Sequence, residues 1–390
     1  MRSHREPRIC VVGAGTHFLS GISYYTMRLA NALAGRHRVS VILMRRLLPA
    51  RFYPGRSRVG ASLGRFEYGG PTESVDWFWF PSILRAVALL VRERPDVAVF
   101  QWWSATALHS YVFLALVTRV LGGRVIIEFH ELLDTAEARL PIVYAYVRFM
   151  APVLLRLASG TVVHSEFDRA AVRRTYRIGR RPVLLVPHGP YDQYVATVPS
   201  SRSGAEDSCN LLFFGVIRPF KGLEDLIVAF DAIPQAEIAR YRLTIVGETW
   251  EGWTKPADLI ARSRYRDRIT FINRYVHDDE VGQVFAEADA VVLPYHRSSA
   301  SGPLQIAMSC GLPVVVTAVG GLPEAVGGYD GAILVPARDP DALRHALGRA
   351  AALRGRRFSD PHSWTIAVEH YDRLFAAFRA GRKAVQGAVA

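Results

Sequence analysis

The chain has 390 residues, half of them apolar, which is enough material for two buried cores and argues against disorder away from the chain ends. Its formal net charge of +13 favours phosphorylated ligands or an acidic membrane, and since no zinc-finger spacing or RNP-like strand occurs, we expect no nucleic-acid partner. Three scattered cysteines exclude a disulfide framework, and no run reaches the roughly 18 apolar residues of a membrane span, so we expect a cytoplasmic protein.

The first half of the sequence alternates short apolar runs with amphipathic helical patterns, as parallel βα units do. Strands are predicted at residues 9–12, 39–44, 97–100, 125–129, 161–164 and 183–186, and helices at 24–33, 83–92, 105–121 and 141–158. The polar segment 199–204, rich in helix and strand breakers, then indicates a linker.

A second βα series follows this linker. Its strands are predicted at residues 211–214, 243–246, 269–272, 290–293, 314–317 and 332–335, and its helices at 222–232, 279–286, 303–310, 340–351 and 365–380. We therefore predict an α/β protein with two doubly wound Rossmann-like domains, 1–198 and 210–364, a linker at 199–209 and a last helical segment at 365–390. Ligands of such proteins bind at the carboxyl ends of the strands, here in a cleft that the two domains face.

A glycine-rich loop directly follows the first strand. At Gly15 it begins like a dinucleotide-binding fingerprint, but Phe18 stands at the third glycine position. The second strand ends in Arg45-Arg46 instead of the acidic residue that holds a ribose, which argues against a nicotinamide enzyme. Two interpretations remain: the loop, as far as Gly21, presents amides to an anionic or sugar ligand, or it is a plain β-to-α turn.

The second domain opens with a strand, the turn residue Gly215, and two cations, Arg218 and Lys221, placed just before a helix. The bidentate fork of arginine and the point charge of lysine together suit a diphosphate. The alternative is a pair of solvated surface cations. We favour the diphosphate interpretation because the strand end is expected to face the cleft.

A third motif is the small, polar loop 298–301 before the helix at 303–310. Ser301 or Gly302 fits the helix cap, and Pro303 fits the first turn. The amides at this helix start, as far as Leu304, are expected to form an anion site. The alternative, a well-capped helix without a ligand, does not explain why the loop before it consists of small, mostly polar residues.

In combination these motifs resemble retaining glycosyltransferases of family four, which have the GT-B fold. The resemblance rests on the Arg218/Lys221 pair, the helix start at 302–304 and the runs 311–317 and 320–324, and it covers nearly the whole chain. It implies a nucleotide diphosphate sugar as donor, a carbohydrate, lipid-linked or small-molecule hydroxyl as acceptor, and retention of configuration without metal or cofactor. It also implies that the last helix crosses back to the first domain.

The same resemblance assigns roles by position. It implies catalytic roles for His130, Arg218 and Lys221. Without the resemblance, His130 would be interpreted as a structural histidine at the end of a strand. Expected donor-binding residues are Gly15, Gly215, Arg218, Lys221, Val276, Ser299, Ser301, Gly302, Pro303, Leu304 and Gln305, and expected acceptor-side residues are Gly21 and Glu131.

Two positions depart from the family pattern, which usually has glutamates where this chain has Arg297 and Gln305. Gln305 can bond a ribose through its amide, whereas Arg297 reverses the charge near the donor sugar. Arg297 thereby supports an alternative function, a non-catalytic nucleotide-sugar-binding partner in a polysaccharide assembly complex. A sugar-nucleotide epimerase would need further carboxylates, for which Glu131 and Asp134 are the nearest candidates.

No metal site is predicted. The sequence Asp339-Pro340-Asp341 resembles a metal-binding Asp-x-Asp motif, but its residues suit the start of a helix. No histidine pair has metal-ligand spacing on a plausible helix.

The apolar segment 141–158 carries Arg148 and Arg156, and further arginines follow it. It is either a core-facing helix with a solvated basic face or a helix that lies on anionic lipid. The second interpretation would place the protein in peripheral contact with the inner face of a membrane, close to lipid-linked acceptors.

Overall fold

The computed structural model describes residues 6–15, 21–46, 68–130, 141–179, 181–197, 208–250 and 252–380. Phe18, Glu131, Asp134 and most of the expected linker lie outside these residues. The chain divides into two compact units, one of Met1–Gly189 with Ser363–Ala390 and one of Pro190–His362, and each is described by itself.

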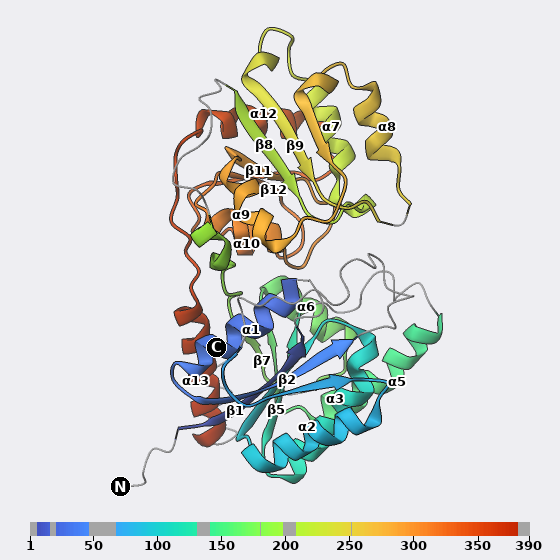
Figure 1. Cartoon of the computed structure of the whole chain (residues 1–390), viewed down its shortest axis with the longest axis vertical. Coiled ribbons are helices and arrows are strands. Elements are labelled where there is room, and N and C mark those ends of the chain that lie inside the picture. The colour runs from blue at the N-terminus through green and yellow to red at the C-terminus, as the bar shows by residue number, and fades with distance from the viewer. Residues whose placement is uncertain are drawn as a thin grey trace. The chain divides into compact units, whose positions relative to one another are not determined.

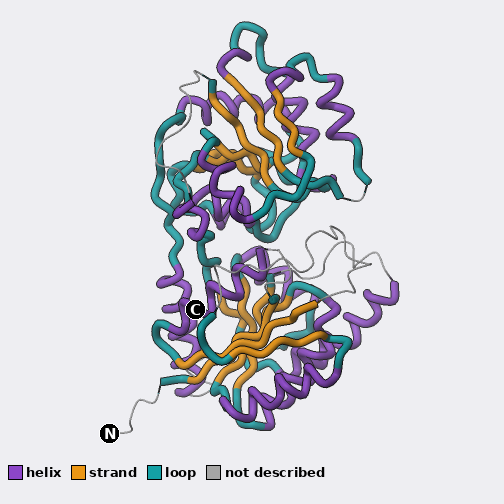
Figure 2. Tube along the Cα trace, in the orientation of Figure 1, coloured by secondary structure: helices purple, strands orange, loops and turns teal. Residues whose placement is uncertain are grey.

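The first unit contains a parallel seven-stranded sheet with the order β3-β2-β1-β4-β5-β6-β7 (Figures 1 and 2). The inner strands β1 and β4 are buried almost throughout because helices cover both faces of the sheet, and strands buried in this way are continuous apolar runs. The strands are β1 (Arg8–Ala14), β2 (Arg38–Arg46), β3 (Thr72–Asp76), β4 (Val97–Trp102), β5 (Arg124–Phe129), β6 (Gly160–Val163) and β7 (Val183–Leu185).

One face of this sheet is covered by α2 (Phe80–Glu93), α3 (Leu108–Val120) and α5 (Pro141–Leu157). Buried residues of these three helices form a single apolar core with alternate residues of the strands, such as Val12 and Phe100. The opposite face carries α1 (Gly21–Ala34) and α13 (Trp364–Ala380), while η3 (Ala105–Ala107) precedes α3 and α6 (Glu166–Thr175) follows β6.

The last helix, α13, belongs to the first unit although the second unit precedes it in sequence. It buries Leu374 and Phe375, and its Asp372 accepts a hydrogen bond from Arg36 (3.0 Å) in the turn after α1. A polar pair at the rim and apolar contacts beneath it therefore hold the helix in place.

The second unit contains a six-stranded parallel sheet with the order β10-β9-β8-β11-β12-β13. Its strands are β8 (Cys209–Phe214), β9 (Tyr241–Val246), β10 (Ile269–Ile272), β11 (Ala290–Leu293), β12 (Val314–Thr317) and β13 (Ala332–Val335). Its helices are η4 (Asp192–Thr197), η5 (Pro219–Lys221), α7 (Leu223–Asp231), η6 (Ile238–Arg240), α8 (Lys255–Arg262), η7 (Arg266–Arg268), α9 (Asp278–Ala286), α10 (Gly302–Ser309), α11 (Leu322–Ala325) and α12 (Pro340–Ala352).

The boundary between the units falls before Pro190 instead of at the expected residue 198. The reason is that η4 packs on the second unit, where the hydroxyl of Tyr194 donates to Asp278 of α9 (3.1 Å). Tyr191 likewise lies against Gly302 at the start of α10.

Both sheets are doubly wound, which confirms the predicted fold class. The strand order reverses between β1 and β4 in the first unit and between β8 and β11 in the second. Ligands of open α/β sheets bind at the carboxyl ends of the strands at such switch points. Among the described residues, no helix is both long and apolar enough to cross a membrane.

Candidate functional site

Arg218 and Lys221 flank the short η5 turn that follows β8, at the switch point of the second sheet. The turn ends at Gly222, which has a left-handed φ of 63°. A Cβ at Gly222 would lie 1.9 Å from the carbonyl oxygen of Pro294, so only glycine allows this turn to lie directly on the loop after β11.

The two loops are also joined by polar contacts. The amide of His296 donates to the carbonyl of Phe220 (2.8 Å), and the His296 Nε2 lies 2.7 Å from a carboxylate oxygen of Asp225 on α7. Since β8 and β11 are neighbours in the sheet, these contacts bring the residues after both strands into one place.

Three cations gather there. The Lys221 Nζ lies 3.7 Å from the ring centre of Tyr295, and the guanidinium of Arg297 lies 4.4 Å from that of Phe220. The guanidinium of Arg218 is 4.9 Å from the ring of Trp250 and 5.8 Å from that of Phe220. Aromatic faces attract cations, so these rings help to hold the charged groups in place. The cluster suits an anionic ligand.

The start of α10 lies beside this cation cluster. A Cβ placed on Gly215, at the end of β8, would lie 3.3 Å from the ring of Pro303. Ser301 is the helix cap and accepts a hydrogen bond from the amide of Leu304 (3.3 Å). Pro303 has no amide hydrogen, and the amide of Leu304 binds the cap residue Ser301. Of the amides expected to bind an anion at this helix start, that of Gly302 therefore remains.

Gln305 is buried on α10, and its Oε1 has no hydrogen-bond partner among the described residues. A buried acceptor of this kind favours a ligand that donates a hydrogen bond, such as a ribose hydroxyl. Ser299 is half-buried in the loop before α10, and Val276 is buried just before α9.

Two glycines of the candidate site use their amides within the protein. The amide of Gly15 donates to the carbonyl of Met44 (2.9 Å), and that of Gly215 donates to the carbonyl of Val246 (2.9 Å). Gly21 is exposed at the start of α1. Glu131 lies outside the described residues, so its acceptor-side role stays a prediction.

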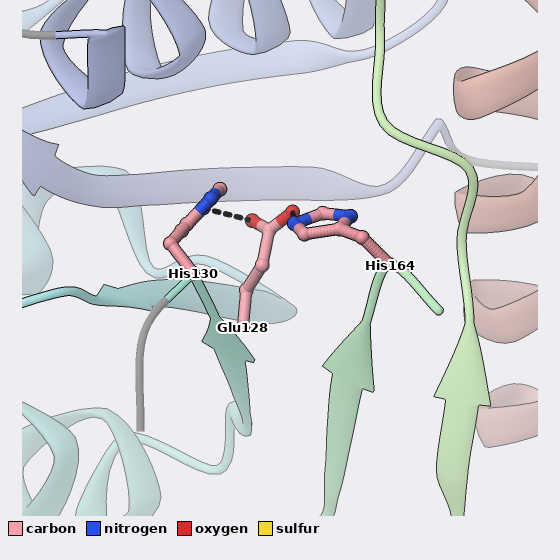
Figure 3. A group of neighbouring side chains, drawn as sticks. All are labelled: Glu128, His130 and His164. Atoms are coloured by element: carbon pink, nitrogen blue, oxygen red, sulfur yellow. Dashed lines mark ion pairs between the residues drawn. The ribbon is translucent and has the colours of Figure 1, made fainter. Parts of the chain in front are cut away.

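His130 follows β5 in the first unit and meets residues that the sequence analysis did not connect with it. Its Nε2 lies 4.0 Å from one oxygen of Glu128, and the Nε2 of His164, after β6, lies 3.6 Å from the other (Figure 3). Glu128 is fully buried; it accepts a hydrogen bond from the hydroxyl of Tyr25 on α1 (2.7 Å) and a longer one from Gln101 (3.5 Å).

Burial sets the protonation of this polar cluster. It lowers the pKa of His130 well below 6.5, and the neighbouring His164 and His188 lower it further. Burial, together with the charge of Glu128, raises the pKa of Tyr25 well above 10. His130 is therefore a neutral imidazole near pH 7, and Tyr25 remains a hydrogen-bond donor to the carboxylate.

Glu128, His130 and His164 together offer a carboxylate and two imidazoles, which are ligand types that zinc accepts. The group was not predicted from the sequence because its members lie in or directly after two different strands. The available signal was the alternation of Glu128 and His130 at the end of one strand beside His164 at the end of the next. Hydrogen bonds from Tyr25 and Gln101 stabilise the buried carboxylate of Glu128. That the protein binds no metal stays a prediction.

Two family models match the chain. The model described as Glycosyltransferase Family 4 matches residues 19–190, and the model described as Glycosyl transferases group 1 matches residues 208–352. Each model therefore corresponds to one of the two units.

Curated relatives agree with these models. The D-inositol 3-phosphate glycosyltransferase of Mycobacteroides abscessus is 32% identical over 185 residues, which cover 44% of this chain and 41% of the relative. The enzyme of the same name from Segniliparus rotundus is 26% identical over 402 aligned residues, covering 94% of this chain and 86% of the relative. For the first relatives found, the match spans about half of the relative's length, between 41% and 50%.

Among solved structures, HepE of Anabaena in complex with UDP and glucose has a TM-score of 0.63 at 18% identity, covering 95% of this chain and 100% of HepE. This likeness concerns the fold. Since the two family models together account for most of both units, the chain belongs to glycosyltransferase family 4 and has the GT-B fold.

Proposed function

We propose that the protein transfers a sugar from a nucleotide diphosphate sugar to a hydroxyl group of a carbohydrate, lipid-linked or small-molecule acceptor. The observation that carries this proposal is the cation cluster of Arg218, Lys221 and Arg297 at the switch point of the second sheet. Membership of glycosyltransferase family 4 supplies the reaction class that such an anion site would serve.

The proposed chemistry is electrostatic. The acceptor oxygen forms a bond to the anomeric carbon, the bond from that carbon to the diphosphate oxygen breaks, and the hydroxyl proton passes to the leaving phosphate. Negative charge grows on the diphosphate during this step, and Arg218 and Lys221 would stabilise it. Their aromatic supports hold them before the substrate arrives, so little reorganisation would accompany the reaction.

Further roles are proposed for residues beside the cations. The buried Gln305 would accept a hydrogen bond from the ribose, and the amide of Gly302 would donate to a phosphate oxygen. Ser299 and Val276 would complete the donor site. In the first unit His130, as a neutral imidazole, would contact the reacting sugar through a hydrogen bond instead of a charge.

We also propose that the sugar keeps its anomeric configuration and that the reaction needs no metal. Both follow from the resemblance to retaining enzymes of the family. Proton NMR of the first product formed would test the first point, because the coupling constant of the anomeric proton distinguishes retention from inversion. Turnover in the presence of EDTA would test the second.

The role of Lys221 can be tested with a matched control. Lys221→Ala should lower the rate of nucleoside diphosphate release by at least about 10²-fold, the usual cost of removing a group that stabilises developing charge. Lys255→Ala removes an exposed lysine from α8 of the same unit and should leave the rate unchanged. Equal rates for both variants would contradict the proposed site. Donor binding without release, across many acceptors, would favour the non-catalytic alternative.

A further inference from the structure

The outer surface of α2, α3 and α5 in the first unit is unusually apolar. Three successive aromatic residues at the start of α2 are exposed, Phe78 (45%), Trp79 (56%) and Phe80 (59%). Soluble surfaces expose single apolar residues routinely, but a run of three large rings is a mark of an interaction site.

The apolar surface continues over the two neighbouring helices. Phe113, Leu116 and Val120 repeat at helical spacing on the outer side of α3, and Val120 is 78% exposed. On α5 the outward residues include Ile142 (86% exposed) and Phe149 (72%). Each of the three helices therefore carries a stripe of exposed apolar residues. The rings of Phe80 and Phe113 lie 6.2 Å apart and connect the stripe of α2 with that of α3.

These stripes point the same way because the three helices form one layer. Their opposite sides pack into the same core against one face of the sheet, so their outer sides all look away from it (Figure 1). The cation cluster belongs to the other unit, so this surface shares no residue with the proposed donor site.

Nearly all charges on the same helices are positive, and one of the arginines, Arg85, is paired with Glu73 of β3 (3.3 Å). The three helices carry the arginines Arg85, Arg92, Arg119, Arg148 and Arg156, and a single acidic residue, Glu93, which Arg92 binds (2.9 Å). A second copy of the chain bound to this surface would place these arginines near the same arginines of its partner, where like charges repel. An anionic bilayer would complement them, while exposed tryptophan and tyrosine rings suit the boundary between lipid headgroups and acyl chains.

We propose that the layer α2-α3-α5 binds the surface of an anionic lipid bilayer, with the aromatic and aliphatic stripes entering the headgroup region and the arginines bound to lipid phosphates. The protein would lie on the membrane and not span it. The inference does not depend on the proposed transfer reaction, although a lipid-linked acceptor would then be met at the surface where it resides.

Co-sedimentation of the full chain with vesicles tests this proposal. The chain should sediment with vesicles of phosphatidylcholine mixed with phosphatidylglycerol, and much less with phosphatidylcholine alone. Raising the salt concentration should weaken the binding, because exposed charges are screened. A chain that stays in the supernatant with both lipids would overturn the proposal.

A pair of double variants locates the surface. Ile142→Glu with Phe149→Glu places two carboxylates on the outer side of α5 and should lower the partition into mixed vesicles by at least about tenfold, since it removes apolar contacts and adds repulsion. Val228→Glu with Leu334→Glu makes the same change at exposed aliphatic residues of the second unit, and its partition should match the wild type. Equal loss in the two double variants would refute the assignment of the surface.

Two further readouts separate this proposal from its rivals. Brominated lipid in the mixed vesicles should quench the fluorescence of the wild type more than that of Trp79→Phe, because Trp79 would lie at the boundary between lipid headgroups and acyl chains. If instead the wild type is a dimer in solution, and Ile142→Glu with Phe149→Glu makes it a monomer, the surface binds a second copy and the membrane proposal is wrong. Unchanged midpoints of urea unfolding in all variants would show that they are folded.

Discussion

The close approach at Gly222 gives a sharp prediction about how the donor site is assembled. Gly222→Ala and Gly252→Ala change two glycines of the same unit with the same φ of 63°, so both variants meet the same left-handed backbone penalty. They differ in their surroundings. A Cβ at Gly252 would meet no atom of the described residues within 4 Å, whereas one at Gly222 would lie 1.9 Å from the carbonyl oxygen of Pro294.

The expected magnitudes follow from this difference. A left-handed alanine costs roughly 1–2 kcal/mol, and this should be the whole loss in Gly252→Ala. In Gly222→Ala the η5 turn must also move away from the loop after β11, and overpacking of this kind costs typically about 1–3 kcal/mol more. Urea unfolding followed by circular dichroism should therefore show a larger loss in Gly222→Ala, by at least about 1 kcal/mol.

The same displacement should affect binding. Arg218 and Lys221 flank the turn that moves, while Arg297 stays on the other loop, so Gly222→Ala should weaken nucleoside diphosphate binding by about tenfold or more. Gly252→Ala should bind as the wild type does. Equal losses of stability in the two variants, or unchanged binding in Gly222→Ala, would refute the argument that this contact aligns the cations.

Three other predictions concern single side chains. Arg297→Gln should weaken nucleoside diphosphate binding by about tenfold, the value of one charge-assisted hydrogen bond, and make it less sensitive to salt; calorimetric titration at two salt concentrations checks both. His130 stays neutral in the folded protein but takes up a proton on unfolding below pH 6.5, so the free energy of unfolding should fall as the pH drops below that value. In urea unfolding, His130→Gln should reduce the slope of this free energy against pH by up to about 1.4 kcal/mol per pH unit. Tyr25→Phe removes a hydrogen bond to the buried carboxylate of Glu128 and should cost about 2 kcal/mol in the same assay, more than Tyr111→Phe, whose equally buried hydroxyl donates to a neutral carbonyl.

Most of the fold could be predicted because parallel strands buried on both faces are short, continuous apolar runs. The strand predicted at 290–293 coincides with β11, and that at 314–317 coincides with β12. Several elements of the described residues escaped prediction, among them β3, α6 and α8. The strand β3 (TESVD) is polar and lies at the sheet edge, the helix α6 carries many charges, and the helix α8 is only eight residues long.

The candidate site was predictable only in part. Spacing along the chain indicated that Arg218 and Lys221 belong together. It could not show that Arg297 joins them, because that depends on the pairing of β8 with β11 and on the contact at Gly222. The neighbours of His130 were missed for the same reason, since Glu128 and His164 meet only when β5 and β6 are side by side.

The most direct test of the proposed function is a donor panel. The purified chain would be incubated with EDTA and a series of nucleotide diphosphate sugars, and both its thermal stability and the release of nucleoside diphosphate would be followed. We predict that at least one donor raises the melting temperature and is slowly hydrolysed, and that Lys221→Ala loses the hydrolysis. If no sugar nucleotide and no free nucleoside diphosphate stabilises the wild type, the assignment of Arg218 and Lys221 as the diphosphate site is wrong.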